Sequence, residues 1–563
     1  MSTNTELANM FHTMATILEI KGENAFKVNA NTKVARVLED LVEDVATIDD
    51  ITKISGVGKS SAQKIEQYIS TGSMDGFDKL VNSIPNGLLG LIEVQGIGPK
   101  TVRRLWQEIG VTDIPSLKEA ISEGKLDSMD RMGKKTIQNM TESLDFLALN
   151  ANRTRLGVAM PIANNLVALL HTCSGVQRVE HAGSLRRGKD TIGDIDILAS
   201  TTDPQLLTDT FCQMDAVEKI LAQGETKCAV RLETGLQVDL RIVEDEAFGA
   251  ALLYFTGSKE HNIVLRERAS KQKKKLNEYA LTPPNVSNTE KDIYENLGLP
   301  WVPPEIREDR GEFTCTETPA LIVEDDILSD LHCHTHASDG HMTVEELARI
   351  AISRGYHTIA VTDHSQSQAQ ANGLKPDRLY SHIEHIREVN QQINEITILA
   401  GSEVDILPDG SLDYDDELLE LLDIVVASPH AALQQTPEVA TRRLLAAIEH
   451  PLVHIIGHPT GRIINKRKGL EPDFPSLVAA AVENHTALEL NANSYRLDLR
   501  DTQVRAAVDG GAQISINTDA HRPEDFDQLQ YGILTARRGW VLPHNCINCF
   551  GHDELQTWVQ RNW

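Results

Sequence analysis

The sequence predicts a multidomain chain with three differently folded parts: an all-α first part, an α+β middle part and a C-terminal α/β barrel. Its 563 residues exceed what one hydrophobic core organises, and about 150 residues per domain suggests three or four folded units. The first part repeats a glycine-centred turn followed by a helical segment. The middle part alternates aspartates with apolar residues, and the last part alternates short apolar runs with helical segments.

Changes in these patterns give the expected domain boundaries. We expect helical domains over 1–85 and 86–150, an α+β domain over 151–243, a smaller domain over 244–315, a linker over 316–327 and the barrel over 328–563.

Two segments of the first part share a pattern of two glycines separated by one apolar residue, then a lysine or Pro-Lys and a helical stretch. They are ISGVGKSSAQKIEQYI over 54–69 and VQGIGPKTVRRLW over 94–106. Glycine supplies left-handed backbone angles between helices and leaves amide groups free at the second helix's N-terminus, where they can hold a phosphate. Ordinary glycine-capped helix connections are the alternative. Two copies with matching lysines favour phosphate binding.

These segments resemble helix-hairpin-helix DNA-binding motifs, which grip the backbone without reading bases. A third segment, MDRMGKKTIQNM over 129–140, keeps one of the two glycines and is a degenerate copy. The resemblance implies six DNA contacts: Gly56, Gly58, Lys59, Gly96, Gly98 and Lys100.

Two strand-like segments of the middle part carry carboxylates on one face. In GDIDIL, Asp194 and Asp196 alternate with isoleucines at the period of a strand. The segment LQVDLRIV over 236–243 repeats the arrangement and adds Asp239. Three carboxylates on one sheet face suit two hydrated Mg²⁺ ions, which prefer oxygen ligands. Three solvated aspartates at a sheet edge are the alternative.

The flanking residues extend this pattern. GSLRRG over 183–188 offers a hydroxyl, a glycine turn and guanidinium groups of the kind that hold phosphates. YFTGSKEHNIVLRERA over 254–269 and WVPPEIREDRGE over 301–312 follow. Together these segments resemble the family X DNA polymerases. The resemblance implies a nucleotidyltransferase palm and a thumb that use deoxynucleoside triphosphates and gapped or nicked DNA. Its catalytic metal ligands would be Asp194, Asp196 and Asp239.

The same resemblance implies further contacts around these aspartates. Ser184 and Arg187 would hold the outer phosphates of the nucleotide, and Arg266 would touch the template side. The implied nucleotide-binding residues are Gly183, Ser184, Arg187, Tyr254, Phe255, Gly257 and Asn262. The basic run KQKKK over 271–275 is better explained as a solvated helix face than as a DNA track.

A lyase activity known in polymerase beta-like relatives is only partly matched. There a lysine of the first hairpin is the nucleophile, beside a basic and aromatic pocket for a 5′-phosphate. Lys64 occupies the nucleophile's position and Lys27 one pocket position. Asn31 and Thr32 stand where the pattern has an aromatic and a basic residue. The resemblance therefore leaves Lys64 as a candidate without a complete pocket.

The last part ends nearly every apolar run with a residue that can bind a metal. In a β/α barrel the C-terminal strand ends meet at one mouth, so these side chains should converge. His332 and His334 alternate on the first strand, and His336, on the same face, is left outside the set. Mixed imidazole and carboxylate ligands favour two or three Zn²⁺, Mn²⁺ or Fe²⁺ ions over Ca²⁺. The nine expected ligands are His332, His334, Asp339, His364, Glu403, His430, His458, Asp519 and His521.

This ligand series resembles the PHP (polymerase and histidinol phosphatase) phosphoesterase domain. The resemblance implies hydrolysis of phosphoesters: a 3′–5′ exonuclease, a 3′-phosphatase or an abasic-site endonuclease acting in base excision repair. The basic stretch GRIINKRK over 461–468 follows His458 directly, which makes Arg462 a candidate contact to a DNA backbone.

Composition narrows these expectations. A net charge of −28 argues against a broad phosphate-binding surface, so DNA contacts should be local. The chain opens without a signal-like segment and has no apolar run of roughly 18 residues, so we expect a cytoplasmic protein with no membrane partner. Its seven cysteines show no framework spacing, so we expect reduced thiols. We also expect a monomer. Two other functions stay open: an end-processing DNA-binding protein with an inactive polymerase half, and a small-molecule phosphatase that uses the barrel alone.

Overall fold

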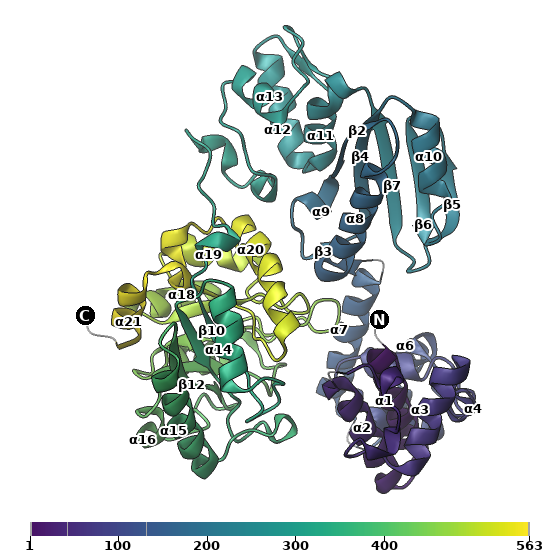
Figure 1. The fold of residues 1–563 in the computed structure, drawn as a ribbon, viewed down its shortest axis with the longest axis vertical. Coiled ribbons are helices and arrows are strands. Elements are labelled where there is room, and N and C mark those ends of the chain that lie inside the picture. The colour runs from purple at the N-terminus through teal and green to yellow at the C-terminus, as the bar shows by residue number, and fades with distance from the viewer. Residues whose placement is uncertain (1–2, 42, 131, 152, 561–563) are drawn as a thin grey trace. The chain divides into compact units, whose positions relative to one another are not determined.

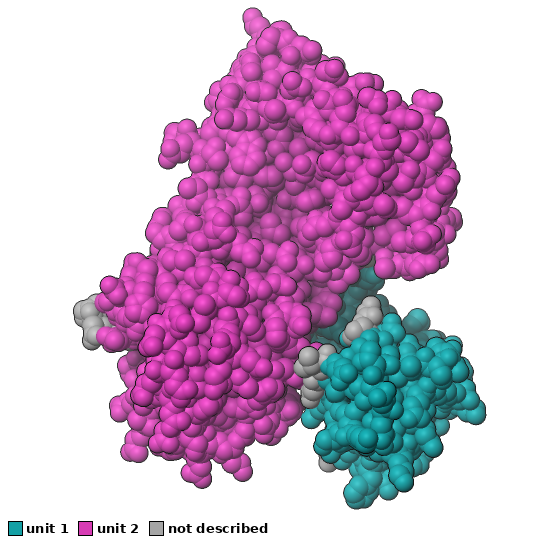
Figure 2. Space-filling view, in the orientation of Figure 1, with its two compact units in different colours: residues 1–151, 465–467 teal, residues 152–464, 468–563 magenta. Residues whose placement is uncertain are grey.

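The structure is a computed structural model that describes residues 3–41, 43–130, 132–151 and 153–560 (Figure 1). The chain forms two compact units, residues 1–151 with 465–467 and residues 152–464 with 468–563 (Figure 2). The first unit is helical, and the second holds the α+β part and the barrel, which confirms the expected fold class. No helix within the described ranges is long and apolar enough to cross a bilayer.

The first unit packs its helices around two hydrophobic cores, one for each glycine turn. Its α-helices are α1 (Thr3–Lys21), α2 (Ala25–Asp40), α3 (Lys59–Thr71), α4 (Asp75–Val81), α5 (Pro99–Ile109), α6 (Ile114–Ser122) and α7 (Lys134–Asn150). Its 3₁₀ helices are η1 (Val45–Thr47), η2 (Ile51–Lys53), η3 (Leu89–Glu93) and η4 (Lys125–Ser128).

Both glycine turns have the backbone that the sequence predicts. Gly56 and Gly96 adopt left-handed φ angles of +96° and +87°. Gly58 and Gly98 are the N-caps of α3 and α5, and a side chain at either position would meet no atom within 4 Å. The element before each turn is the short 3₁₀ helix η2 or η3 and not an α-helix. The N-termini of α3 and α5 therefore present open amide groups.

The α+β part is built on a five-stranded sheet, here called the central sheet, in the order β2-β4-β7-β6-β5. The pair β4–β7 is parallel and the other pairs are antiparallel. Helices α8 (Leu156–His171) and α10 (Pro204–Cys212) cover one face of it (Figure 1). The strands are β2 (Val176–His181), β4 (Asp194–Thr201), β5 (Val217–Gln223), β6 (Lys227–Leu232) and β7 (Gln237–Val243). The short strands β1 (Thr154–Arg155) and β3 (Thr191–Ile192) pair with each other beside it.

A smaller helical part follows the central sheet. It consists of η5 (Asp245–Ala247), α11 (Phe248–Thr256), α12 (Lys259–Lys271), the hairpin β8 (Lys275–Leu276) and β9 (Leu281–Thr282), α13 (Glu290–Asn296), η6 (Pro304–Ile306) and η7 (Glu312–Thr314). Arg307 is fully buried in its core, where its two terminal nitrogens donate to the carboxylate oxygens of Glu290 at 2.6 and 3.0 Å.

The last part is a barrel of seven parallel strands in chain order, β10 to β16. Its strands are β10 (Ser329–Cys333), β11 (Thr358–Val361), β12 (Thr397–Asp405), β13 (Ile424–Ser428), β14 (Ile455–Ile456), β15 (Ala487–Asn491) and β16 (Ile514–Asn517). Its helices are α14 (Val344–Ser353), α15 (Pro376–Gln392), α16 (Asp416–Leu419), α17 (Pro437–Ile448), α18 (Phe474–Glu483), α19 (Asp501–Asp509), α20 (Leu529–Arg538) and α21 (His552–Gln560). A parallel bridge between Cys333 and Ala520 brings the first and last strands together, so the strand ends meet at one mouth.

The barrel and the central sheet share a packed contact inside the second unit. Ile464, Leu497 and Tyr531 of the barrel are buried in the same hydrophobic core as the central sheet. At the start of α8, a side chain at Gly157 would overlap Ser494 of the barrel. The two parts are therefore held in close apposition.

Two candidate metal centres

The three aspartates of the middle part come together on neighbouring strands of the central sheet. The parallel register of β4 and β7 sets Asp196 directly beside Asp239, while Asp194 pairs with Gln237. The isoleucines on either side of Asp196 are at most 1% exposed, and Asp194 is exposed. The alternation predicted from sequence thus points the carboxylates away from the core.

The turn before β4 approaches these carboxylates closely. Gly183 has a left-handed φ of +61°, and a side chain there would overlap the carboxylate of Asp196. Only glycine permits this approach without strain. The four-residue helix α9 (Gly183–Arg186) begins at this point and carries Ser184.

The electrostatics of the three aspartates favour a bound cation. Burial, together with Asp194 and Asp239, raises the pKa of Asp196 to about 7. Burial and the charge of Asp239 also raise the pKa of Asp194. The amine of Lys227 lies 3.5 Å from Asp239 but is 44% exposed. Divalent cations relieve this repulsion and take oxygen ligands, so the residues present fit Mg²⁺.

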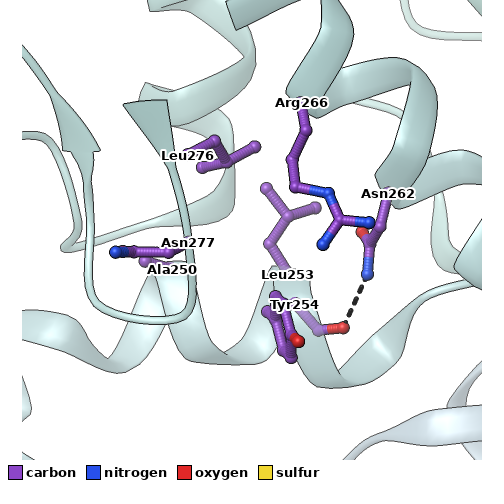
Figure 3. A pocket seen from close by; sticks show the side chains of 7 residues that line it. All are labelled: Ala250, Leu253, Tyr254, Asn262, Arg266, Leu276 and Asn277. Atoms are coloured by element: carbon purple, nitrogen blue, oxygen red, sulfur yellow. Dashed lines mark hydrogen bonds between the residues drawn. The ribbon is translucent and has the colours of Figure 1, made fainter. Parts of the chain in front are cut away.

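Three of the expected nucleotide and DNA contacts line one pocket in the smaller helical part. Tyr254, Asn262 and Arg266 face it together with Leu276 and Asn277 of the β8–β9 hairpin (Figure 3). The amide nitrogen of Asn262 donates to the carbonyl oxygen of Tyr254 at 2.7 Å. Side chains from α11 and α12 therefore share one pocket.

Arg187, the expected triphosphate contact, is held by protein groups. Its Nε donates to Glu308 at 3.1 Å, and a terminal nitrogen donates to the Thr256 carbonyl at 2.6 Å. The same carboxylate pairs with Lys189 and with Arg538 from α20 of the barrel. Arg538 also donates to the carbonyl of Arg187 at 2.7 Å. Sequence reasoning gave no signal for this link.

The barrel brings all nine expected metal ligands to the mouth formed by its strand ends. In the parts of the chain that the structure describes, three groups have ligand atoms within 4.8 Å of one another, and all three lie here. They are His334, Asp339, His364 and His521; His332, His334 and Asp519; and His364, Glu403 and His430. The ninth residue, His458, has its Nε2 2.9 Å from Glu403. His336 is exposed and lies outside these groups.

Glu403, on β12, lies at the middle of this cluster. Its Oε1 is 3.4 Å from His332 Nε2 and 3.3 Å from His430 Nε2, and its Oε2 is 2.7 Å from His364 Nδ1. Burial alone would raise the pKa of Glu403, but the surrounding imidazoles hold it well below its usual value. Burial and two neighbouring imidazoles lower the pKa of His334 to about 4, which leaves it neutral, as a metal ligand must be.

Several buried atoms of the cluster have no hydrogen-bond partner. Both oxygens of Glu403, both ring nitrogens of His334 and Nε2 of His332 are among them. Buried polar atoms are normally paired, because an unpaired one costs about 1–3 kcal/mol. Imidazole nitrogens and carboxylate oxygens are common metal ligands. Several of them lie unpaired and close together at the barrel mouth, so these residues fit a cluster of divalent cations.

Two carboxylates that sequence reasoning missed orient these imidazoles. Glu489 accepts from His332 Nδ1 at 2.8 Å, and Asp405 accepts from His430 Nδ1 at 2.6 Å. Each bond leaves Nε2 of the ring facing the centre, the usual role of a carboxylate behind a metal-bound histidine. A carboxylate within the apolar strand ALELN was the available signal for Glu489.

Arg462 differs from its expected role as a surface contact to DNA. The side chain is buried, with an exposed fraction of 6%, and a terminal nitrogen donates to Asp190 of the α+β part at 3.0 Å. Another donates to the carbonyl of Leu497. This part of the barrel packs against the α+β part, and the Arg462 side chain connects the two. Its guanidinium is therefore not available to a phosphate backbone.

The remaining expected contacts lie in the first unit. Lys59 and Lys100 are exposed at the starts of α3 and α5. Lys64 is half-buried on α3 with its amine 6.0 Å from the centre of the Phe11 ring, and burial lowers the pKa of that amine. Lys27 pairs with a neighbouring glutamate at 3.0 Å. These positions leave the lyase prediction open to test.

Four segments of the chain match family models. Residues 2–74 match the family described as "Helix-hairpin-helix domain" and residues 88–145 "SAM-like Helix-hairpin-helix tandem". Residues 251–308 match "DNA polymerase beta thumb" and residues 330–493 "PHP domain". The chain is 36% identical to the DNA polymerase/3′-5′ exonuclease PolX of Bacillus subtilis (strain 168), with 99% of both chains covered. The chain belongs to the PolX family.

Shorter proteins also match part of this chain. A probable phosphatase of Syntrophotalea carbinolica is 29% identical over 39% of this chain and 90% of that protein. A probable phosphatase of Thermoanaerobacter sp. (strain X514) is 27% identical over 39% of this chain and 90% of that protein. Each of these relatives is thus covered almost completely by about two fifths of this chain.

Proposed function

We propose that this PolX-family chain is a DNA polymerase that fills short gaps during DNA repair and also degrades DNA from its 3′ ends. The observation that carries the proposal is the presence of two separate ligand sets in one chain: three carboxylates on the central sheet, and an imidazole-rich cluster in the barrel. The full-length similarity to a polymerase/3′-5′ exonuclease supports the pairing of these activities.

In the polymerase reaction, Asp194, Asp196 and Asp239 would hold Mg²⁺, which neutralises the triphosphate and activates the primer hydroxyl when bound. The open amide ends of α3 and α5 would grip the backbone of gapped or nicked DNA. Tyr254 and Asn262 would position the nucleotide. Catalysis would rest mainly on positioning and charge neutralisation.

In the hydrolytic reaction, the nine barrel residues would hold two or three Mn²⁺ or Zn²⁺ ions, which lower the pKa of a bound water towards 7. Glu489 and Asp405 keep the His332 and His430 rings turned to the centre. The neutral ring of His334 stays available as a ligand. A 3′-phosphatase is a second candidate, because barrel-sized relatives are named probable phosphatases. Abasic-site cleavage, and lyase chemistry at Lys64, are extensions of the proposal.

A labelled one-nucleotide gap separates the two activities. Asp196→Ala should abolish nucleotide addition and leave Mn²⁺-dependent 3′ degradation intact, and His334→Ala should do the reverse. Wild-type chain with and without nucleotides, in Mg²⁺, Mn²⁺ or Zn²⁺, completes the set. If either substitution removed both activities while the circular dichroism spectrum stayed unchanged, the proposal of two independent sites would be wrong.

A further inference from the structure

A turn at the barrel mouth exposes an aromatic ring that the chemistry described above does not use. The turn spans residues 493–496, just after β15, and Tyr495 within it is 53% exposed. The guanidinium of Arg155, from the α+β part, lies 3.5 Å from the centre of the ring. An arginine over one face of a tyrosine holds the ring in place through a cation–π contact, while the side chain stays accessible to water.

The next residue connects this ring to the metal centre. Arg496 lines the barrel pocket together with Glu403, His458 and Asp519, and its Nε is 4.0 Å from Asp519. It is the arginine among the residues that line this pocket. A guanidinium beside the metal ligands suits a phosphodiester oxygen. Consecutive Cα atoms are about 3.8 Å apart, so the backbone of Tyr495 starts at the rim of this pocket, although its own side chain is not among those that line it.

The turn is also fixed in place from both sides. The backbone amide of Tyr495 donates to the Asn493 side chain at 3.0 Å, and its carbonyl accepts from Ile464 at 2.8 Å. Ser494 fits against Gly157 at the start of α8, and Leu497 is fully buried. The exposed ring is therefore held before any ligand arrives, which lowers the entropic cost of binding.

We propose that Tyr495, backed by Arg155, stacks an unpaired base of the DNA strand whose phosphodiester Arg496 holds at the barrel centre. This inference rests on the proposed 3′ degradation and names the side chain that would hold the terminal base of the strand being degraded. Every base has a π face, so such a platform holds a strand end without selecting sequence. One aromatic ring beside one arginine can hold one base and one phosphate, which is suited to single-stranded DNA. Duplex DNA would be held by the hairpin motifs in another part of the chain.

The test uses the full chain and a trithymidylate too short to span other DNA contacts. Tyr495→Ala should raise the KM for Mn²⁺-dependent cleavage about ten-fold with kcat within about two-fold. Tyr495→Phe should restore the KM, because the ring remains. Hydrolysis of bis(4-nitrophenyl) phosphate, which has no base, should not change. The matched control is Tyr380→Ala, which removes a tyrosine of α15 that is 45% exposed.

Binding gives a readout that does not depend on turnover. A trinucleotide with terminal 2-aminopurine, in EDTA, should lose fluorescence on binding wild-type chain and not on binding the Tyr495→Ala variant. An unchanged KM and unchanged quenching in that variant would overturn the stacking inference while leaving 3′ degradation established. If wild-type chain cleaves the small ester but no oligonucleotide, the proposed exonuclease fails and this inference fails with it.

Discussion

The central sheet and the barrel both gather candidate metal ligands, but they differ in how much of the ligand set the chain supplies. In the barrel, His332, His334 and Glu403 are fully buried, and imidazoles alternate with carboxylates around one point. On the sheet, three carboxylates stand together, Asp194 is exposed, and the pKa of Asp196 rises to about 7 through burial and its neighbours. In the barrel, imidazoles of the same cluster offset the negative charge of the carboxylates. On the sheet, the negative charge of the three carboxylates is not offset in this way.

This difference matches the chemistry expected of each centre. Mg²⁺ keeps several waters and usually binds through one or two carboxylates plus substrate phosphates, so a sparse set is completed when a nucleotide arrives. Imidazole-rich sets bind transition metals before the substrate does. We therefore expect the barrel to retain its ions through purification and the sheet to bind Mg²⁺ only weakly without nucleotide.

The largest effect should follow from the residue at the middle of the barrel cluster. Glu403→Gln keeps the shape of the side chain but removes the charge that faces five imidazoles. We expect 3′ degradation to fall at least about a hundred-fold and gap filling to stay unchanged. Time courses on labelled gapped DNA measure both rates. Glu449 is an exposed residue of the same barrel, and Glu449→Gln is the control variant. If Glu403→Gln reduced the rate of gap filling as much as the rate of 3′ degradation, the two centres would not be separate.

A smaller effect should follow from the carboxylate behind the ligands. Glu489→Gln removes the negative charge that faces the His332 Nδ1 proton, whose bond to Glu489 is 2.8 Å, and replaces it with a neutral amide. We expect Mn²⁺ affinity to fall about 10- to 100-fold, because such groups fix the tautomer and orientation of the ring. Titration of the metal-free variant with Mn²⁺ measures this change. Degradation should recover at high Mn²⁺; a rate that stays low at saturation would instead place Glu489 in the chemical step.

Sequence reasoning predicted which residues lie together in each candidate centre, because each prediction depends on a simple period. The alternation around Asp196 fixes its face of the sheet, and a parallel barrel gathers every strand end at one mouth, so nine ligands could be named without coordinates. The side-by-side register of Asp196 and Asp239 was not predictable, because β4 and β7 are separated by β5 and β6 in the chain.

Contacts between parts of the chain were the weakest predictions. Arg462 stands in a basic run, which suggests a surface cation, yet it is buried against Asp190. The bond from Arg538 to the Arg187 carbonyl joins residues 351 apart. Such pairs depend on how two folded parts pack, and no local period in the sequence records that packing.

The pH response should reveal the uncompensated charge of the sheet centre. Because the raised pKa of Asp196 is about 7, this carboxyl carries a proton below that pH and must release it before binding a cation. We expect the Mg²⁺ concentration for half-maximal gap filling to rise about ten-fold between pH 8 and pH 6. Gap filling by the Glu403→Gln variant across Mg²⁺ and pH measures it. A requirement that does not change over this range would show that Asp196 is already ionised.

The smallest expected effect tests whether the barrel helps to position the nucleotide site. Arg538 donates to the Arg187 carbonyl at 2.7 Å and shares the Glu308 carboxylate with the Arg187 side chain. Arg538→Ala should free the backbone of the GSLRRG turn and leave Glu308 to hold Arg187 more strongly. We expect the KM for the incoming nucleotide to rise about three-fold, with 3′ degradation unchanged.

A double-mutant cycle separates this coupling from general destabilisation. Adding Glu308→Gln to Arg538→Ala releases the Arg187 guanidinium, so the two substitutions together should raise the KM less than their separate effects predict. Arg505→Ala, which removes an arginine of α19 paired with Asp509 at 2.7 Å, is the control for loss of a barrel arginine. Additive effects would mean that Arg538 supports the fold but does not act on the nucleotide site. Non-additive effects on the KM would show that Arg538 of the barrel and Glu308 act together on the nucleotide site of the central sheet.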